Sequence, residues 1–133
     1  MKKNQLPIYF CLMLLSIAFN SSCQNSNESV KNISADSLNS ILKTSDAIIL
    51  DVRTPEEFAE GHISGAININ FHDENFESTL DTLDKEKTYN VYCRSGNRSG
   101  KSIDLMTKKG FKRINHLKGG MIEWEGKGFE TVK

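Results

Sequence analysis

The chain has 133 residues, enough for one globular domain, and its 17 basic and 17 acidic side chains give a net charge of zero. This balance excludes the strongly basic surface that binds nucleic acid, so we expect no nucleic-acid partner. Three cysteines do not make a disulfide scaffold, and three dispersed histidines without a second nearby cysteine do not make a metal site. We therefore expect a single domain that uses no metal and no cofactor.

The first 22 residues have the pattern of a secretory signal peptide: two lysines, an uncharged apolar run from Ile8 to Phe19, and small polar residues. The run is shorter than the ~20 residues of a permanent transmembrane helix. Cys23 follows Ser22 and resembles the lipidation site of bacterial lipoproteins, although Asn20 stands where an aliphatic residue is usual. We predict an exported protein, periplasmic or in the cell envelope, anchored to a membrane by lipid on Cys23. Ordinary cleavage near Ser22 is the alternative.

Residues 23–31 are polar and have no apolar period, which predicts a solvated tether. The folded domain is therefore expected to occupy residues 32–133. Its first element is a short helix capped by Ser34 and extending to about Lys43.

A continuous apolar run over residues 47–52 has the length of a buried strand. The next segment has a cap residue at Thr54, a proline at Pro55 and acidic residues in the first turn, which predicts a short helix that ends at Gly61. A second short strand is expected over residues 66–70. These three elements form the first strand–helix–strand unit of the chain.

The rest of the chain continues this alternation. The expected elements are a helix over 76–85, a strand over 88–93, a helix over 99–110, a strand over 111–117 and a helical turn over 119–128. Strands that alternate with helices predict an α/β fold with a mostly parallel central sheet flanked by helices on both faces.

Cys93 stands at the end of the strand expected over 88–93 and precedes a turn of Gly, Ser, Asn and Arg residues. Open α/β sheets bind ligands beyond the carboxyl ends of their strands. The turn offers successive backbone N–H groups and the positive end of the following helix, which together favour an anion. With Arg94 and Arg98 beside it, the Cys93 thiolate is expected to be stabilised and nucleophilic at neutral pH. A structural buried cysteine is the alternative.

The same stretch ends in Gly100, Lys101 and Ser102, as a nucleotide phosphate loop does. A phosphate loop also needs a glycine at position 95, where this chain has Ser95. The spacing therefore argues against nucleotide binding.

Three segments resemble the single-domain rhodanese family: Asp51–Asn68, Cys93–Ser99 and Leu117–Trp124. The resemblance implies a rhodanese-like fold and sulfurtransferase activity. Cys93 would then accept a sulfane sulfur from thiosulfate or a persulfide, become a persulfide itself, and pass the sulfur to a thiol or cyanide. A redox protein that reduces the persulfide is a further expected partner.

The resemblance also implies a set of residues that bind the anionic donor and stabilise the persulfide. They are Arg94, Ser95, Gly96, Asn97, Arg98 and Ser99.

Outside this loop, Asp51, Arg53, Glu57 and His62 are candidates for a catalytic acid or base. Sulfur transfer between thiolates needs little proton movement, so we expect Asp51, Arg53 and His62 to support the site structurally. The other two histidines, His72 and His116, are expected at the surface or in a strand.

Two alternatives to a sulfurtransferase remain open. One is a non-catalytic rhodanese-like module that binds a partner or carries sulfur, and the other is a phosphatase or arsenate reductase. Only four residues separate Cys93 from Arg98, one fewer than in phosphatases that share this fold. The tighter loop favours sulfur, because a phosphoryl group would lose some of the N–H contacts that its transition state needs.

Overall fold

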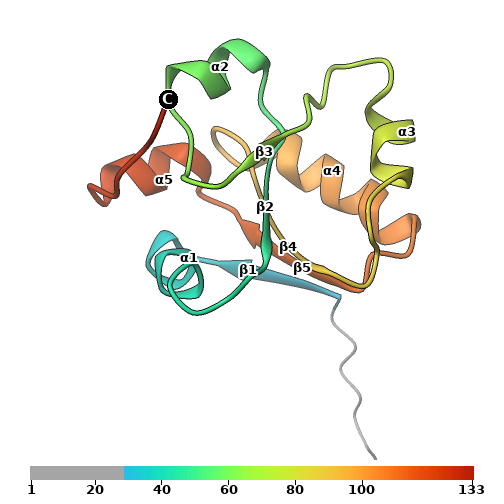
Figure 1. The fold of residues 1–133 in the computed structure, drawn as a ribbon, viewed down its shortest axis with the longest axis horizontal. Helices are drawn as coiled ribbons and strands as arrows, with labels where there is room; N and C mark the ends of the chain where they lie inside the picture. The colour runs from blue at the N-terminus through green and yellow to red at the C-terminus, as the bar shows by residue number, and fades with distance from the viewer. Residues whose placement is uncertain (1–28) are drawn as a thin grey trace, which may run out of the picture.

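The computed structural model describes residues 29–133, so the predicted signal peptide and Cys23 lie outside the described residues. The described chain forms a five-stranded sheet in the order β1-β5-β4-β2-β3, and every neighbouring pair is parallel (Figure 1). The strands are β1 (Val30–Ile33), β2 (Ile48–Asp51), β3 (Ile67–Asn68), β4 (Thr88–Tyr92) and β5 (Arg113–Leu117). The helices are α1 (Ala35–Ile41), α2 (Pro55–Glu60), α3 (Phe76–Asp81), α4 (Asn97–Lys108) and α5 (Gly120–Gly126).

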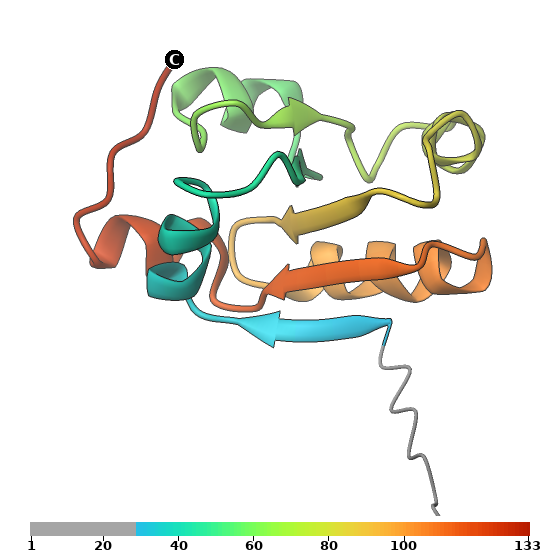
Figure 2. The same cartoon turned by 60° about the horizontal axis from the view of Figure 1, so that its bottom comes forward.

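Helices cover both faces of the sheet, because successive strand side chains point to opposite faces and each face buries an apolar set (Figure 2). One core packs β2 and β4 against α3 and α4; it includes Leu50, Val91, Phe76, Leu80, Ile103 and Met106. The other core packs the same strands against α1 and α5; it includes Ile49, Tyr92, Leu38, Met121 and Trp124. The predicted α/β fold is confirmed.

The edge strand β1 was not predicted as a strand. It includes Val30 and Lys31, which the sequence analysis assigned to the tether, so regular structure begins two residues before the expected domain boundary. Only Val30 and Ile33 are half-buried, whereas Lys31 and Asn32 are exposed. An edge strand with so little apolar surface is recognised by its pairing with β5 and not by its own pattern.

The helix starts follow local sequence signals. Ser34 Oγ accepts a hydrogen bond from the first turn of α1, and Thr54 forms a reciprocal capping box with Glu57 at the start of α2. Helix α4 begins at Asn97, two residues before the expected start. Gly96, with φ of +96°, turns the chain almost directly from β4 into the helix.

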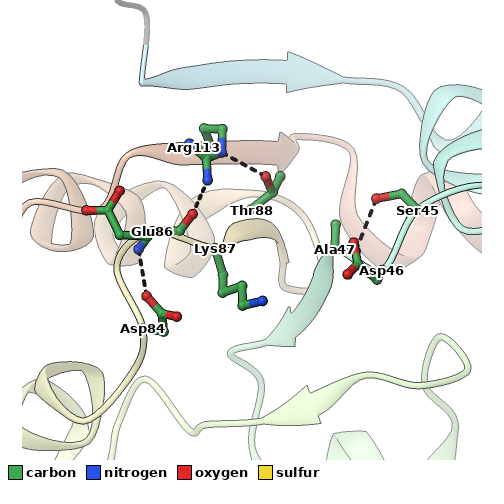
Figure 3. Close-up of a pocket in the computed structure, with 8 residues that line it drawn as sticks. All are labelled: Ser45, Asp46, Ala47, Asp84, Glu86, Lys87, Thr88 and Arg113. Carbon is green, nitrogen blue, oxygen red and sulfur yellow. Dashed lines mark hydrogen bonds between the residues drawn. The ribbon is translucent and has the colours of Figure 1, made fainter.

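The amino ends of the strands carry a hollow of about 390 Å³ (Figure 3). Its lining residues are Ser45, Asp46, Ala47, Asp84, Glu86, Lys87, Thr88 and Arg113. Several of these groups bond to one another: Arg113 donates to Thr88 Oγ1 at 3.1 Å and to the carbonyl of Glu86. The hollow is lined by neither cysteine nor histidine, and it lies at the opposite end of β4 from Cys93.

Candidate active site around Cys93

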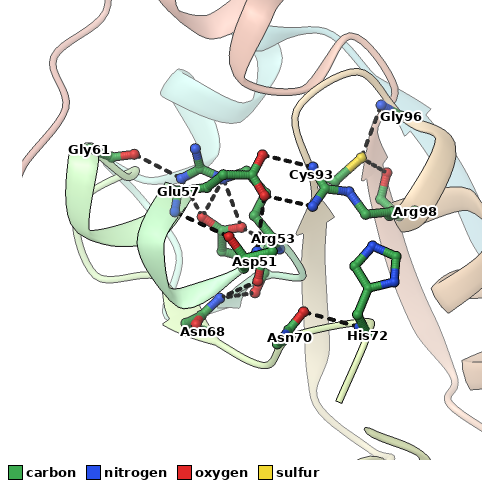
Figure 4. Close-up of polar contacts among 12 residues, drawn as sticks. Asp51, Arg53, Glu57, Gly61, Asn68, Asn70, His72, Cys93, Gly96 and Arg98 are labelled. Carbon is green, nitrogen blue, oxygen red and sulfur yellow. Dashed lines mark hydrogen bonds and ion pairs between the residues drawn. The ribbon is translucent and has the colours of Figure 1, made fainter. Parts of the chain in front are cut away.

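Cys93 follows the last residue of β4, at the carboxyl edge of the sheet, and is 1% exposed. The loop after it folds back over the sulfur (Figure 4). The backbone N–H of Gly96 donates to Cys93 Sγ at 3.1 Å, and Ser99 Oγ lies 3.3 Å from the same sulfur. The sulfur thus sits inside a ring of donors that belongs to one loop and the first turn of α4.

Two opposing effects set the pKa of Cys93. Burial by itself would raise it, because burial disfavours the charged thiolate. Hydrogen bonds from the Ser99 hydroxyl and from the backbone N–H groups of Ser99, Ser95 and Gly96 favour the thiolate and lower the pKa below its ordinary value. The geometry therefore creates a nucleophile at the centre of the loop.

Two glycines let the Cys93 loop and the chain at the start of α5 approach each other closely. Gly96 has φ of +96°, and a Cβ at this position would collide with the carbonyl of Lys118. Gly120 has φ of +58°, and a Cβ there would collide with the carbonyl of Cys93. Next to it, the backbone N–H of Met121 donates to the Cys93 carbonyl at 3.0 Å. The start of α5 therefore packs against the backbone of the Cys93 loop and supports it.

Arg98 is paired with α2. Its Nη1 and Nη2 donate to the two carboxylate oxygens of Glu57 at 2.6 and 2.9 Å. These hydrogen bonds hold the pKa of Glu57 at about 2, far below its ordinary value. The guanidinium expected to contact an anionic donor therefore also ties the Cys93 loop to the neighbouring helix. Glu57 was a candidate acid or base in the sequence, and its contact with Arg98 was not predicted.

Asp51 and Arg53 form an ion pair beside the Cys93 loop. Arg53 Nη2 donates to Asp51 Oδ2 at 2.7 Å and to the carbonyl of Gly61 at 2.8 Å, and both charged side chains are buried. Asn68 Nδ2 donates to the backbone carbonyls of Asp51 and Arg53 at 3.0 and 2.9 Å. This network joins β2, β3 and the end of α2 into one frame beside the Cys93 loop (Figure 4).

His62 makes its contacts at the far end of α2. Its ring stacks on Phe58 with centroids 3.6 Å apart, and Nδ1 lies 2.9 Å from the Phe58 carbonyl. Its backbone pairs with Val132 near the C-terminus. The hydrogen bonds of His62 therefore connect α2 to Val132, whereas the Cys93 sulfur is bonded to Gly96 and Ser99.

His116, expected at the surface or in a strand, contributes a buried side chain to the site. It lies in β5, is 8% exposed, and its Nε2 is 2.7 Å from Ser99 Oγ. Burial and the positive charge of Lys118 lower its pKa, so the ring is neutral at neutral pH. One signal was available: His116 is two residues after the core residue Ile114, so both point to the sheet face under α4.

The other loop side chains form the rim of the site. Arg94, Ser95 and Asn97 are exposed, so they are available to a ligand from solvent. Within residues 29–133, no group of three or more His, Cys, Asp or Glu side chains is arranged to hold a metal ion. In the same residues, no helix combines the length and the apolarity that a membrane span requires.

Comparisons with known proteins find relatives of this chain. The protein YtwF of Bacillus subtilis, whose name places it among sulfurtransferases, is 39% identical over 98 residues, which cover 73% of this chain and 92% of that protein. A sulfurtransferase of Allochromatium vinosum is 33% identical over 104 residues, which cover 77% of this chain and 95% of the relative. The crystal structure of a rhodanese-related protein from Thermoplasma volcanium matches with a TM-score of 0.68 and 29% identity, and covers 77% of this chain and 97% of that one. The Rhodanese-like domain pattern itself matches residues 34–127, and this chain belongs to the Rhodanese-like domain family.

Proposed function

We propose that this protein is a sulfurtransferase that carries a sulfane sulfur on Cys93 between an anionic donor and a nucleophilic acceptor. The observation that supports this proposal is the environment of Cys93 Sγ. The sulfur accepts a hydrogen bond from the Gly96 N–H at 3.1 Å and lies 3.3 Å from the Ser99 hydroxyl oxygen. These groups stabilise a thiolate, and a thiolate is the form that attacks sulfur. Membership of the family and its sulfurtransferase-named relatives support the same chemistry.

In the loading step, the Cys93 thiolate attacks the outer sulfur of the donor. With thiosulfate, the new bond joins Sγ to the outer sulfur, the sulfur–sulfur bond of thiosulfate breaks, and sulfite leaves with its electron pair. With a persulfide donor, the leaving group is the donor thiolate. Electrons and charge balance without an external oxidant, and no proton has to move.

In the discharge step, cyanide or a thiolate attacks the outer sulfur of the Cys93 persulfide. The acceptor gains the sulfur as thiocyanate or as a new persulfide, and Sγ leaves as a thiolate. The groups that favour the attacking thiolate in loading also favour the leaving thiolate in discharge. Gly96 and Ser99 therefore assist both half-reactions from one position.

The proposed substrates are small anions with an exposed terminal sulfur. Cys93 is 1% exposed, so a donor must reach it with a slender end instead of a bulky centre. The loop amides then surround the transferred sulfur. Arg98 adds positive charge beside the thiolate, although Glu57 shares its guanidinium. Thiosulfate and low-molecular-weight persulfides fit these requirements.

The deciding experiment detects sulfur on Cys93 directly. The full chain is incubated with thiosulfate or with glutathione persulfide, trapped with iodoacetamide and digested with trypsin, which releases residues 88–94 as one peptide. We expect this peptide to gain the mass of one sulfur atom. Cyanide added before the trapping step should remove that sulfur as thiocyanate. A peptide that gains no sulfur from either donor would overturn the proposal, and a peptide that holds sulfur against cyanide and thiols would indicate a carrier module.

The same preparations separate sulfur transfer from phosphate hydrolysis. Thiosulfate-to-cyanide transfer and aryl phosphate hydrolysis are measured side by side, with Cys93→Ser as the blank for both. We expect Cys93-dependent transfer of sulfur to dominate, because the four-residue spacing between Cys93 and Arg98 leaves a tight ring of amides. Cys93-dependent phosphate release that exceeds sulfur transfer would reverse the assignment.

A further inference from the structure

A chain of buried hydrogen-bonding groups runs from the reactive sulfur into the interior. Cys93 Sγ lies 3.3 Å from Ser99 Oγ, and Ser99 Oγ lies 2.7 Å from His116 Nε2. The three residues come from the end of β4, the first turn of α4 and β5, and they are 1%, 0% and 8% exposed. Because these three groups are shielded from water, the hydrogens that they carry determine which group donates to which.

Counting hydrogens fixes the direction of the chain once Cys93 ionises. A thiolate only accepts hydrogen bonds, so the single hydroxyl proton of Ser99 must point at Sγ. Ser99 Oγ is then left as an acceptor toward His116. At 2.7 Å the facing Nε2 must therefore carry a hydrogen and donate it to Ser99 Oγ. The neutral imidazole keeps its other nitrogen, Nδ1, unprotonated.

The surrounding charges agree with a neutral imidazole at this position. Lys118 is the charged group that acts on His116, and with burial it disfavours a second proton on the ring. Arg98 is the charged group that interacts with Cys93, and it favours the thiolate. Gly100 of α4, where an added Cβ would lie 3.9 Å from Cε1 of the ring, adds no charge. His116 therefore acts as a fixed neutral donor at neutral pH.

We propose that His116 is a positioning residue for Cys93: its Nε2–H holds the Ser99 hydroxyl in the orientation that donates to the Cys93 thiolate. Applied to sulfur transfer, this inference rests on the proposed function. The oriented hydroxyl stabilises Sγ as the attacking group in loading and as the leaving group in discharge, and a better leaving thiolate departs faster. Without His116, the Ser99 hydroxyl is free to turn away from the sulfur.

The test measures the acidity of the unloaded thiol. The rate of alkylation of Cys93 by iodoacetamide is followed against pH in the full chain, using the peptide of residues 88–94 so that other cysteines do not interfere. His116→Leu removes the donor and retains an apolar side chain. We expect it to raise the pKa of Cys93 by about one unit, a tenfold loss of thiolate at lower pH. His116→Gln, whose amide reaches about as far as Nε2, should restore most of the acidity.

A double-mutant cycle decides whether His116 acts through Ser99. Ser99→Ala should raise the pKa of Cys93 by itself, and adding His116→Leu to it should produce no further rise. Circular dichroism and thermal melting establish which variants are folded. If His116→Leu does not fold, His116→Asn replaces it in the cycle, because its shorter amide does not reach Ser99.

The measurement uses no sulfur donor, so its outcome is separate from that of the proposed function. A shift in acidity without persulfide formation would retain the role of His116 in positioning Ser99 and contradict the sulfurtransferase proposal. The inference is overturned by a folded His116→Leu or His116→Asn protein with the wild-type pKa of Cys93. It is also overturned by a further rise in pKa when the histidine substitution is added to Ser99→Ala.

Discussion

At the scale of single residues, two glycines with similar positive φ angles have different surroundings. Gly96 has φ of +96° and Gly110 has φ of +90°, so a side chain would be strained at either position. A Cβ on Gly96 would collide with the carbonyl of Lys118, whereas a Cβ on Gly110 would have no heavy atom within 4 Å. The pair therefore separates backbone strain from the close approach that shapes the Cys93 loop.

We expect Gly96→Ala to slow alkylation of Cys93 and to lower the melting temperature. Gly110→Ala should lower the melting temperature through a backbone strain of about 1–2 kcal/mol and leave alkylation of Cys93 unchanged. The two variants are compared by thermal denaturation and by peptide-resolved alkylation. Equal alkylation rates in both variants would show that the contact with Lys118 does not shape the loop.

The buried Asp51–Arg53 pair gives a second prediction at this scale. Asp51→Ala leaves the Arg53 guanidinium buried without its partner, which should destabilise the fold by about 3–5 kcal/mol. Urea denaturation measures the loss, and we expect the folded fraction to keep most of its activity. Asp36→Ala is the matched control, because it removes the carboxylate of an ion pair whose side chains are 58% and 49% exposed and should change stability little. A stable but inactive Asp51→Ala protein would instead place Asp51 in the chemistry.

At the scale of elements, the pair of Glu57 and Arg98 connects α2 to the first turn of α4. Glu57 also closes the capping box with Thr54, so one carboxylate both starts α2 and fixes that helix to the Cys93 loop. The side chains of Arg98 and Glu57 are 20% and 28% exposed, so solvent only partly screens their interaction.

This link predicts a pH dependence with a defined sign. The pKa of Glu57 falls from 4.5 to about 2 in the folded protein, so its stabilisation is fully present above pH 4.5 and is lost as pH falls toward 2. Removing it with Glu57→Gln should cost about 2 kcal/mol at neutral pH. The free energies of unfolding of wild type and variant, measured by denaturation at a series of pH values, should converge as pH falls from 4.5 toward 2. The control is Glu56→Gln, which removes an exposed carboxylate next to Glu57. If the free energy of unfolding of this variant approached that of the wild type along the same pH curve, the assignment of the effect to Glu57 would be refuted.

At the scale of the whole molecule, local patterns predicted the elements, and long-range pairing created the unexpected parts of the site. Thr54 and Cys93 were placed correctly, because a helix cap and the end of a buried strand depend on adjacent residues. Arg98 and Glu57 are 41 residues apart, and Ser99 and His116 are 17 apart. Only the folded arrangement of the helices on the sheet brings such pairs together, and only sheet pairing reveals β1.

The lipid anchor proposed for Cys23 is tested on the whole protein in a bacterial host. We expect radiolabelled fatty acid to be incorporated into the wild-type chain, and the chain to remain with membranes. The Cys23→Ser variant should be exported without label and recovered in the soluble fraction. Label retained in that variant, or an intact mass without lipid in the wild type, would contradict the proposal.

The parallel sheet also gives the domain a direction. All five strands point the same way, so the chain enters the fold at the amino edge through β1, while Cys93 lies at the carboxyl edge beyond β4. Six residues separate Cys23 from Val30, a covalent reach of roughly 25 Å at most. An anchored domain would thus be attached at the edge opposite Cys93, an arrangement that favours acceptors dissolved in solution over acceptors embedded in lipid.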